Sequence, residues 1–95
     1  MKVLITGASS GIGLDMAKYL AQKKHELILV ARDRKKLEYI QEKLPTKVTI
    51  IVADLSNEQK VKELYVLTKG ENIDILINND SHQLYFRPRE KSGLR

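Results

Sequence analysis

Glycine and serine residues cluster near the N-terminus at a spacing that could bind phosphate. The segment TGASSGIG occupies residues 6–13 and lies between an apolar run and an amphipathic stretch. Unpaired N–H groups and the positive end of the dipole bind phosphate at a helix N-terminus. Glycine allows a close approach because it has no Cβ. We expect Gly7 to permit a tight turn, Gly11 to admit a pyrophosphate, and Gly13 to pack the helix on the strand. The alternative is a glycine turn that binds no ligand.

Short apolar runs alternate with helical patterns through the first eighty residues. The runs predict strands at 2–6, 26–31, 47–53 and 73–78, and the patterns between them predict helices at 12–24, 34–44 and 57–69. The predicted buried face of the first helix comprises Ile12, Met16, Ala17, Leu20 and Ala21. Strands that are apolar throughout indicate a parallel sheet covered on both faces. With right-handed crossovers, the sequence predicts an α/β fold, half of a doubly wound Rossmann-type parallel sheet, with strand order 3-2-1-4 and three helices.

The composition excludes several classes of protein. The chain has 95 residues, 42% of them hydrophobic, which is enough for one small domain. It has no cysteine, so disulfide scaffolds and thiolate metal sites are excluded, and its two histidines, His25 and His82, are isolated. We therefore predict no metal site. No apolar run approaches the ~20 residues that span a bilayer, and the N-terminus does not resemble a signal peptide. We expect a cytoplasmic protein that does not contact a membrane.

The excess of positive charge lies at the end of the chain. Residues 1–80 carry 13 Lys and Arg against 11 Asp and Glu, whereas residues 81–95 carry 4 against 1. The nearly neutral body argues against nucleic-acid binding. Residues 80–95 show no periodicity and contain Pro88, so we expect a disordered basic tail. The predicted domain therefore covers residues 1–79.

Three motifs in this order resemble the short-chain dehydrogenase/reductase family. TGASSGIG matches the family's cofactor turn, ADLS at residues 53–56 resembles its adenine-contacting segment, and ILINN at residues 75–79 resembles the start of its NNAG segment. Each motif falls at the end of a predicted strand, and the resemblance covers residues 1–79. It implies an oxidoreductase that transfers hydride between a nicotinamide cofactor and a carbonyl or alcohol.

The resemblance also implies which residues bind the cofactor. The residues around the pyrophosphate and the adenosine ribose would be Gly7, Ser9, Ser10, Gly11 and Ile12. Asp54 would accept a hydrogen bond from the adenine amino group, beside the backbone of Leu55. Asn78 and Asn79 would lie near the ribose and stabilise the centre of the sheet.

The end of the second predicted strand indicates which cofactor is preferred. Folds that prefer NAD place an acidic residue there for the ribose 2′-hydroxyl, whereas an arginine accommodates the 2′-phosphate of NADP. Here Ala31 ends the strand and Arg32 follows. A guanidinium group matches a phosphate bidentately. We therefore predict NADP rather than NAD, although Asp33 is close by and Arg32 could be a solvated surface charge.

The resemblance implies that the catalytic Ser, Tyr, Lys and Asn of the family lie further along than this chain extends. Tyr and Lys do occur four residues apart at 19/23, 39/43 and 65/69. Each pair falls inside a predicted helix, where residues at this spacing share a face. We interpret these pairs as half-buried tyrosines beside surface lysines. The chain alone is then an inactive, N-terminal NADP(H)-binding portion of an oxidoreductase. The alternatives are a non-catalytic nucleotide-binding module and a truncated product without function.

The family pattern breaks at Asp80-Ser81, where the family has Ala-Gly. A carboxylate there would face an anionic cofactor. We hypothesise a change of reading frame, which predicts that another frame of the gene continues the motif.

The predicted topology also exposes apolar surface. In the order 3-2-1-4, helices one and two cover one face and helix three covers only part of the other. Strand four would be an unpaired apolar edge. We therefore expect self-association through this strand and the bare part of the sheet face. The alternatives are that the tail from Ser81 folds back over this surface, or that the chain is only partly folded.

Overall fold

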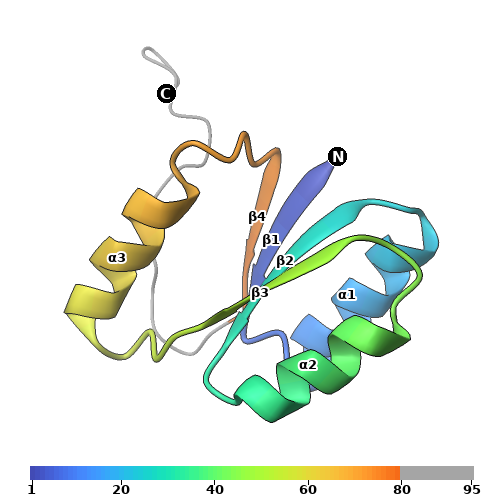
Figure 1. Cartoon of the computed structure of the whole chain (residues 1–95), viewed down its shortest axis with the longest axis horizontal. Coiled ribbons are helices and arrows are strands. Elements are labelled where there is room, and N and C mark those ends of the chain that lie inside the picture. The colour runs from blue at the N-terminus through green and yellow to red at the C-terminus, as the bar shows by residue number, and fades with distance from the viewer. Residues whose placement is uncertain (80–95) are drawn as a thin grey trace.

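The computed structural model describes residues 1–79, apart from the side chain of Leu67. Its elements are β1 (Lys2–Thr6), α1 (Gly11–Gln22), β2 (Glu26–Ala31), α2 (Arg34–Lys43), β3 (Val48–Val52), α3 (Glu58–Thr68) and β4 (Ile75–Asn78). The strands form one parallel sheet in the order β3-β2-β1-β4 (Figure 1). The predicted fold class and strand order are therefore confirmed. The predicted tail and the Asp80-Ser81 break lie outside the described residues.

The sheet is the middle of three layers, with α1 and α2 on one face and α3 on the other (Figure 1). Successive side chains of a strand point to opposite faces, so the two halves of the core alternate along β1. Val3 and Ile5 pack in the cluster that includes residues of α1 and α2, whereas Leu4 packs in the cluster that contains Leu64 of α3. This division of helices between the faces agrees with the predicted crossovers.

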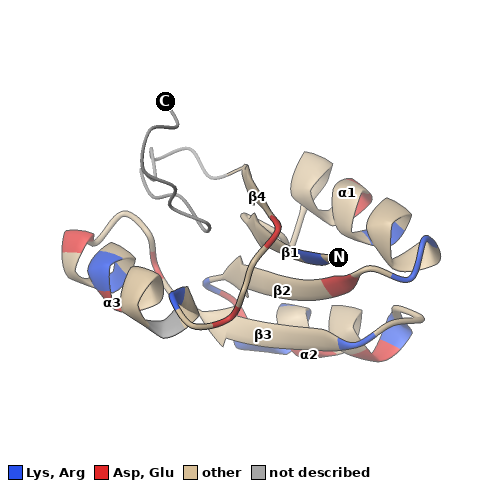
Figure 2. Cartoon of the chain, turned by 90° about the horizontal axis from the view of Figure 1, so that it is seen from above, with Lys and Arg blue, Asp and Glu red and all other residues tan. Residues whose placement is uncertain are grey.

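Charged residues lie on the helices, at the strand ends and in the connecting segments, while the middles of the strands carry none (Figure 2). At the amino edge of the sheet, Lys2 Nζ lies 3.8 Å from Glu26 Oε2 and 3.1 Å from Glu71 Oε1. Strands buried on both faces explain why the sequence shows continuous apolar runs rather than alternation. Within residues 1–79, the helices are too short and too polar to cross a bilayer.

The buried face of α1 differs from the predicted one. Gly13, Ala17 and Ala21 are buried, whereas Ile12 is 70% exposed. Residues four apart share a face of a helix, and Ile12 lies one position, about 100°, away from this stripe. Because the buried residues are small, α1 approaches the sheet closely. Ile12 was therefore wrongly assigned to the core face, while Ala17 and Ala21 were assigned correctly.

Two element boundaries differ from the prediction by two residues, and the others agree to within one. Helix α1 ends at Gln22 because Lys24 adopts φ 66°. The N–H groups of Lys24 and His25 donate to the carbonyls of Ala21 and Leu20, which is the Schellman pattern. Strand β4 begins at Ile75, although the preceding Ile73 is 1% exposed and belongs to the core cluster on the α3 side.

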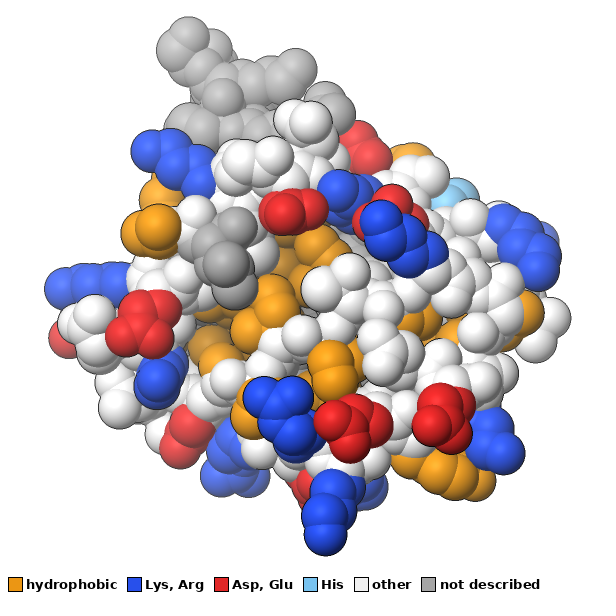
Figure 3. All heavy atoms as spheres, viewed as in Figure 1, with side chains coloured by type: hydrophobic (Ala, Val, Ile, Leu, Met, Phe, Trp, Pro, Cys, Tyr) orange, Lys and Arg blue, Asp and Glu red, His pale blue; other side chains and the backbone are white. Residues whose placement is uncertain are grey.

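Among the described residues, the face toward α3 is covered only in part. Leu4, Ile28 and Val30, on the two central strands, are at most 3% exposed. Ile51 on β3 and Leu76 on β4 are half-buried. Figure 3 shows apolar side chains in the hollow between α3 and the strands. The incompletely covered apolar surface on this face therefore lies on the two outer strands, in agreement with the expectation that α3 covers only part of it.

Candidate functional site

The glycine turn between β1 and α1 has the backbone conformation that its glycines permit. Gly7 has φ 62° and Gly11 has φ 59°, a left-handed region that side chains disfavour. The N–H of Ala8 donates to the carbonyl of Val30 at 3.2 Å, which attaches the turn to the end of β2. A Cβ on Gly13 would lie 2.3 Å from the carbonyl oxygen of Gly7. The roles predicted for Gly7 and Gly13, a tight turn and close packing, therefore agree with this geometry.

The N-terminus of α1 lacks the side-chain cap that the other two helices have. Asp33 accepts from the N–H of Lys36 at the start of α2, and Asn57 accepts from Gln59 and Lys60 at the start of α3. Ser10 is the N-cap residue of α1 and makes no such hydrogen bond. The first N–H groups of a helix have no partner within the helix. Among residues 1–79, nothing therefore prevents an anion from binding those of α1, and a Cβ on Gly11 would meet none of the described atoms within 4 Å.

A polar network joins the glycine turn to the end of β4. The Thr6 hydroxyl donates to Asn78 Oδ1 at 2.9 Å and accepts from the N–H of Asn79 at 3.0 Å. Asn79 Nδ2 donates to the carbonyl of Gly7 at 3.4 Å. Thr6 is fully buried. The network holds two segments more than seventy residues apart in one arrangement, in line with the stabilising role expected of Asn78 and Asn79.

The two charged residues after β2 are in different situations. The Asp33 carboxylate accepts from the N–H of Lys36 at 3.1 Å and so caps α2. Arg32 is exposed, and within residues 1–79 it makes no ion pair. Asp33 therefore caps α2, whereas the Arg32 guanidinium group is accessible at the end of β2.

Asp54 and Leu55 lie just after β3. Asp54 Oδ1 accepts from the N–H of Ser56 at 3.0 Å and from its hydroxyl at 2.7 Å. Leu55 is 5% exposed and packs in the core cluster on the α3 side. The N–H of Ala53 donates to the carbonyl of Ala31 at 3.0 Å, so the loops after β3 and β2 begin side by side.

All the predicted site residues lie at or just after the carboxyl ends of the four parallel strands and therefore share one edge of the sheet, where open α/β sheets bind ligands. Hydrogen bonds tie Gly7, Asn78 and Asn79 together. Arg32 stands at the end of β2, and Asp54 and Leu55 at the end of β3. Ser9, Ser10, Gly11 and the exposed Ile12 complete the turn at the end of β1.

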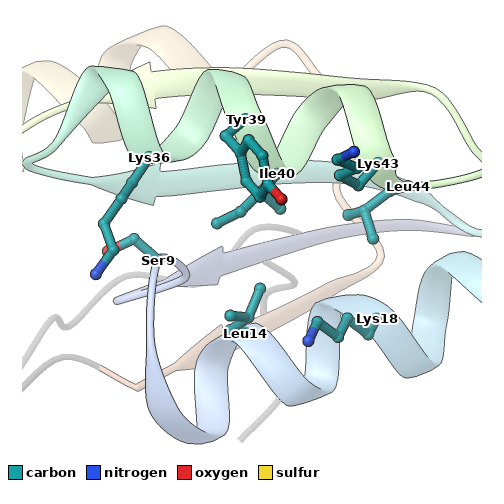
Figure 4. Close-up of a pocket in the computed structure, with 8 residues that line it drawn as sticks. All are labelled: Ser9, Leu14, Lys18, Lys36, Tyr39, Ile40, Lys43 and Leu44. Carbon is teal, nitrogen blue, oxygen red and sulfur yellow. The ribbon is translucent and has the colours of Figure 1, made fainter.

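Two further residues belong to this edge and were not among the predicted site residues. The hydroxyl of Thr6 lies at the centre of the polar network. The sequence feature that could have indicated this residue is its position at the end of the first predicted strand. Lys36 lines a cleft together with Ser9, and Figure 4 shows its side chain extending toward Ser9. Its signal was its place in the first turn of the helix that follows Arg32.

The Tyr and Lys pairs prove to be neighbours on helix surfaces. Lys23 Nζ lies 5.5 Å from the centre of the Tyr19 ring, and Lys43 Nζ lies 5.2 Å from that of Tyr39. These are cation–π contacts. Tyr19 and Tyr39 are more than half exposed, rather than half-buried as predicted, whereas Tyr65 is half-buried as predicted. In the part of the chain that the structure describes, no group of three or more His, Asp or Glu side chains could hold a metal ion.

The strand order, the glycine turn after β1 and the polar edge define a Rossmann-type α/β fold. The chain belongs to the short-chain dehydrogenase family, whose model matches residues 1–90. This match runs past residue 79, where the resemblance was expected to end. The chain is also 30% identical over 96 residues to the NADP-dependent 3-hydroxy acid dehydrogenase YdfG of Escherichia coli K12. That alignment covers 99% of this chain and 39% of the relative.

Solved structures of the family show the same fold. A short-chain dehydrogenase from Sphingobium yanoikuyae in complex with NADPH superposes with a TM-score of 0.75 at 37% identity, over 83% of this chain and 33% of that one. A bulky-bulky ketone specific alcohol dehydrogenase from Comamonas testosteroni has a TM-score of 0.75 at 35% identity, over 85% and 35% of the two chains. The chain therefore spans little more than a third of these relatives.

Proposed function

We propose that this chain is the N-terminal NADP(H)-binding portion of an oxidoreductase that transfers hydride to or from a carbonyl or alcohol. The observation that carries the proposal is the uncapped N-terminus of α1 behind a glycine turn with φ values of 62° and 59°. Its N–H groups and the helix dipole favour a phosphate there. Family membership and the NADP-dependent relatives support the same assignment.

The residues present fit a dinucleotide along this edge. The pyrophosphate would lie against Gly11 and the first N–H groups of α1, beside Ser9, Ser10 and Ile12. The adenine would lie between the ends of β2 and β3, near Asp54 and Leu55, and the ribose near Asn78 and Asn79. Bound NADPH supplies a hydride, and these residues hold and orient it. The chain alone would be inactive, because in the family the catalytic Ser, Tyr and Lys lie beyond the segment that resembles it.

Selection of NADP over NAD would depend on cations at the end of β2. Arg32 is accessible, while Asp33 is engaged at the N-terminus of α2. Lys36 lies in the first turn of α2 and lines a cleft with Ser9. Two cations near one phosphate favour the 2′-phosphorylated cofactor, since each adds a charge-assisted contact. Arg32 offers the bidentate geometry and Lys36 a single ammonium.

The test is equilibrium binding of NADPH and NADH to the full 95-residue chain. Arg32→Ala should weaken NADPH binding by about 10- to 150-fold, the value of a charge-assisted contact, and leave NADH nearly unchanged. Lys35→Ala, which removes an exposed lysine from the first turn of α2, is the matched control. Equal losses for both cofactors would make Arg32 structural. Absence of any NADPH binding by the folded chain would refute the proposed function and leave a truncated product.

A turnover assay separates a cofactor-binding portion from an enzyme. With NADPH and a panel of ketones and aldehydes, the chain should bind cofactor without oxidising it. Measurable turnover would contradict the proposal that this chain is inactive alone.

We also propose self-association through β4. Among the described residues β4 pairs only with β1, and Ile75, Leu76 and Ile77 are half-buried. An edge strand with free N–H and C=O groups is a template for pairing with another chain. A second copy of this chain would satisfy those groups and cover the half-buried side chains.

A further inference from the structure

A cleft of about 390 Å³ opens between α1 and α2, on the side of the sheet away from α3 (Figure 4). Pockets that hold small molecules begin at about 300 Å³. Its lining residues come from the glycine turn and both helices and are Ser9, Leu14, Lys18, Lys36, Tyr39, Ile40, Lys43 and Leu44. Two of these residues, Ser9 and Lys36, also belong to the proposed cofactor site, and the other six lie outside it.

The floor of the cleft is apolar. Ile40 is 7% exposed, and Leu14 and Leu44 are partly buried against the same core cluster. Tyr39, which is 64% exposed, adds an aromatic ring at the wall. Apolar surface of this kind gains free energy when a hydrocarbon group displaces water from it. The floor therefore favours a ligand with an apolar chain.

The rim of the cleft is cationic. It carries the ammonium groups of Lys18, Lys36 and Lys43, and none of the eight lining residues is acidic. None of these three lysines forms an ion pair within residues 1–79. Uncompensated charges of one sign beside a low-dielectric surface raise the local concentration of counter-ions. Figure 4 shows Lys18 and Lys43 at the end of the cleft that Leu44 lines, away from Ser9.

We propose that this cleft binds an amphipathic anion, namely an unbranched hydrocarbon chain that ends in a carboxylate. The hydrocarbon chain of the ligand lies along Leu14, Ile40 and Leu44, beside the Tyr39 ring. The carboxylate lies between Lys18 and Lys43, one from each helix. An inorganic anion would leave the apolar floor in water, and a cationic amphiphile would face three ammonium groups. Only the combination of chain and negative charge matches both surfaces.

The probe is decanoate, titrated below its micelle concentration into the isotope-labelled full chain and followed by amide chemical shifts. We expect saturable shifts in α1 and α2, at and around the lining residues. Acetate has the charge without the chain, and decyltrimethylammonium has the chain without the negative charge. Both should bind at least tenfold more weakly. No saturable shift with decanoate, or equal binding of either control ligand, would overturn the proposal.

Variants locate the carboxylate. Lys18→Gln combined with Lys43→Gln removes the two proposed ion pairs with the ligand carboxylate. Because both pairs are exposed, decanoate binding should weaken by roughly 5- to 25-fold. Lys35→Gln combined with Lys62→Gln removes the same charge from positions that do not line the cleft and should change binding less than twofold. Equal losses in the two double variants would mean that only net charge attracts the anion. Retained amide dispersion shows that each variant is folded.

Discussion

Gly11 and Gly13 lie two residues apart, yet different constraints exclude a side chain at each. Gly11 has φ 59°, and a Cβ there would meet nothing within 4 Å. Gly13 has no such backbone constraint, but its Cβ would lie 2.3 Å from the carbonyl oxygen of Gly7 and 2.8 Å from Asn79 Nδ2. The first glycine is required by its conformation and by the space a ligand needs. The second is required by the packing of α1 on the turn.

Gly11→Val should abolish NADPH binding, because a branched side chain would occupy the open space beside the helix N-terminus. The left-handed backbone adds a cost of about 1–2 kcal/mol in unfolding free energy. Titration with NADPH and urea denaturation measure the two effects separately. A folded Gly11→Val chain that still binds NADPH with unchanged affinity would exclude the glycine turn from the site.

Gly13→Ala should lower the unfolding free energy by about 1–3 kcal/mol, the usual cost of overpacking. The added methyl group meets backbone, which cannot rotate away, and the gain in helix propensity is only about 1 kcal/mol. Gly70→Ala is the control, since a Cβ there meets nothing within 4 Å. Urea denaturation should give Gly13→Ala a clearly lower unfolding free energy than Gly70→Ala. Equal stabilities would show that the turn relaxes around the new methyl group.

At the scale of elements, the three helices differ in how their N-termini are capped. Asp33 and Asn57 cap α2 and α3, and both are residue types that favour the N-cap position. Ser10 is also such a type, but its side chain makes no cap hydrogen bond. The difference concerns geometry rather than residue type, and it leaves the N-terminus of α1 accessible to an anion.

The C-terminal end of α1 provides a test of stability. Lys24 occupies the left-handed position that usually holds glycine. Lys24→Gly should be more stable than Lys24→Ala by about 1 kcal/mol, because only glycine avoids the Cβ penalty. Both variants lose the bond from Lys24 Nζ to the Pro45 carbonyl, so their comparison isolates the backbone effect. At Lys23, with φ −85°, alanine should be the more stable of the two. Thermal unfolding of the four variants measures the stability difference between glycine and alanine at each position.

At the scale of the whole molecule, the sheet has two outer strands of unequal character. Both carry three incompletely buried apolar residues, at positions 50–52 on β3 and 75–77 on β4. Among the described elements, however, α2 packs against β3, whereas β4 makes extensive contacts only with β1. This asymmetry leads us to expect association through β4 rather than β3.

Sedimentation velocity at micromolar concentrations should therefore show species larger than the monomer. Leu76→Lys should shift the chain toward monomer, because a charge at an edge strand opposes pairing. Val52→Lys, on the opposite outer strand, should leave the association unchanged. A well-folded chain that is strictly monomeric at these concentrations would contradict the proposed interface.

Much of this architecture was predictable, and the reason is visible in particular segments. The apolar run at residues 27–31 has no polar alternation, which indicates a strand buried on both faces. The handedness rule for parallel crossovers then restricts the strand order. The glycine turn was recognisable because its residue types reflect local backbone needs. Arg32 was placed at the edge because it follows a predicted strand, whereas Asp54, Asn78 and Asn79 were implied by the resemblance to the family.

The sequence by itself determined the order of elements, the parallel sheet and the edge at which the site residues gather, because these depend on periodicity and on residue types close together in the chain. Only the tertiary structure decided that Ile12 faces solvent, that Thr6 joins Asn78 and Asn79, and that Ser9 and Lys36 line one cleft. These features depend on contacts between residues up to 73 positions apart. Local propensities do not encode such distances, and packing of the assembled layers sets them.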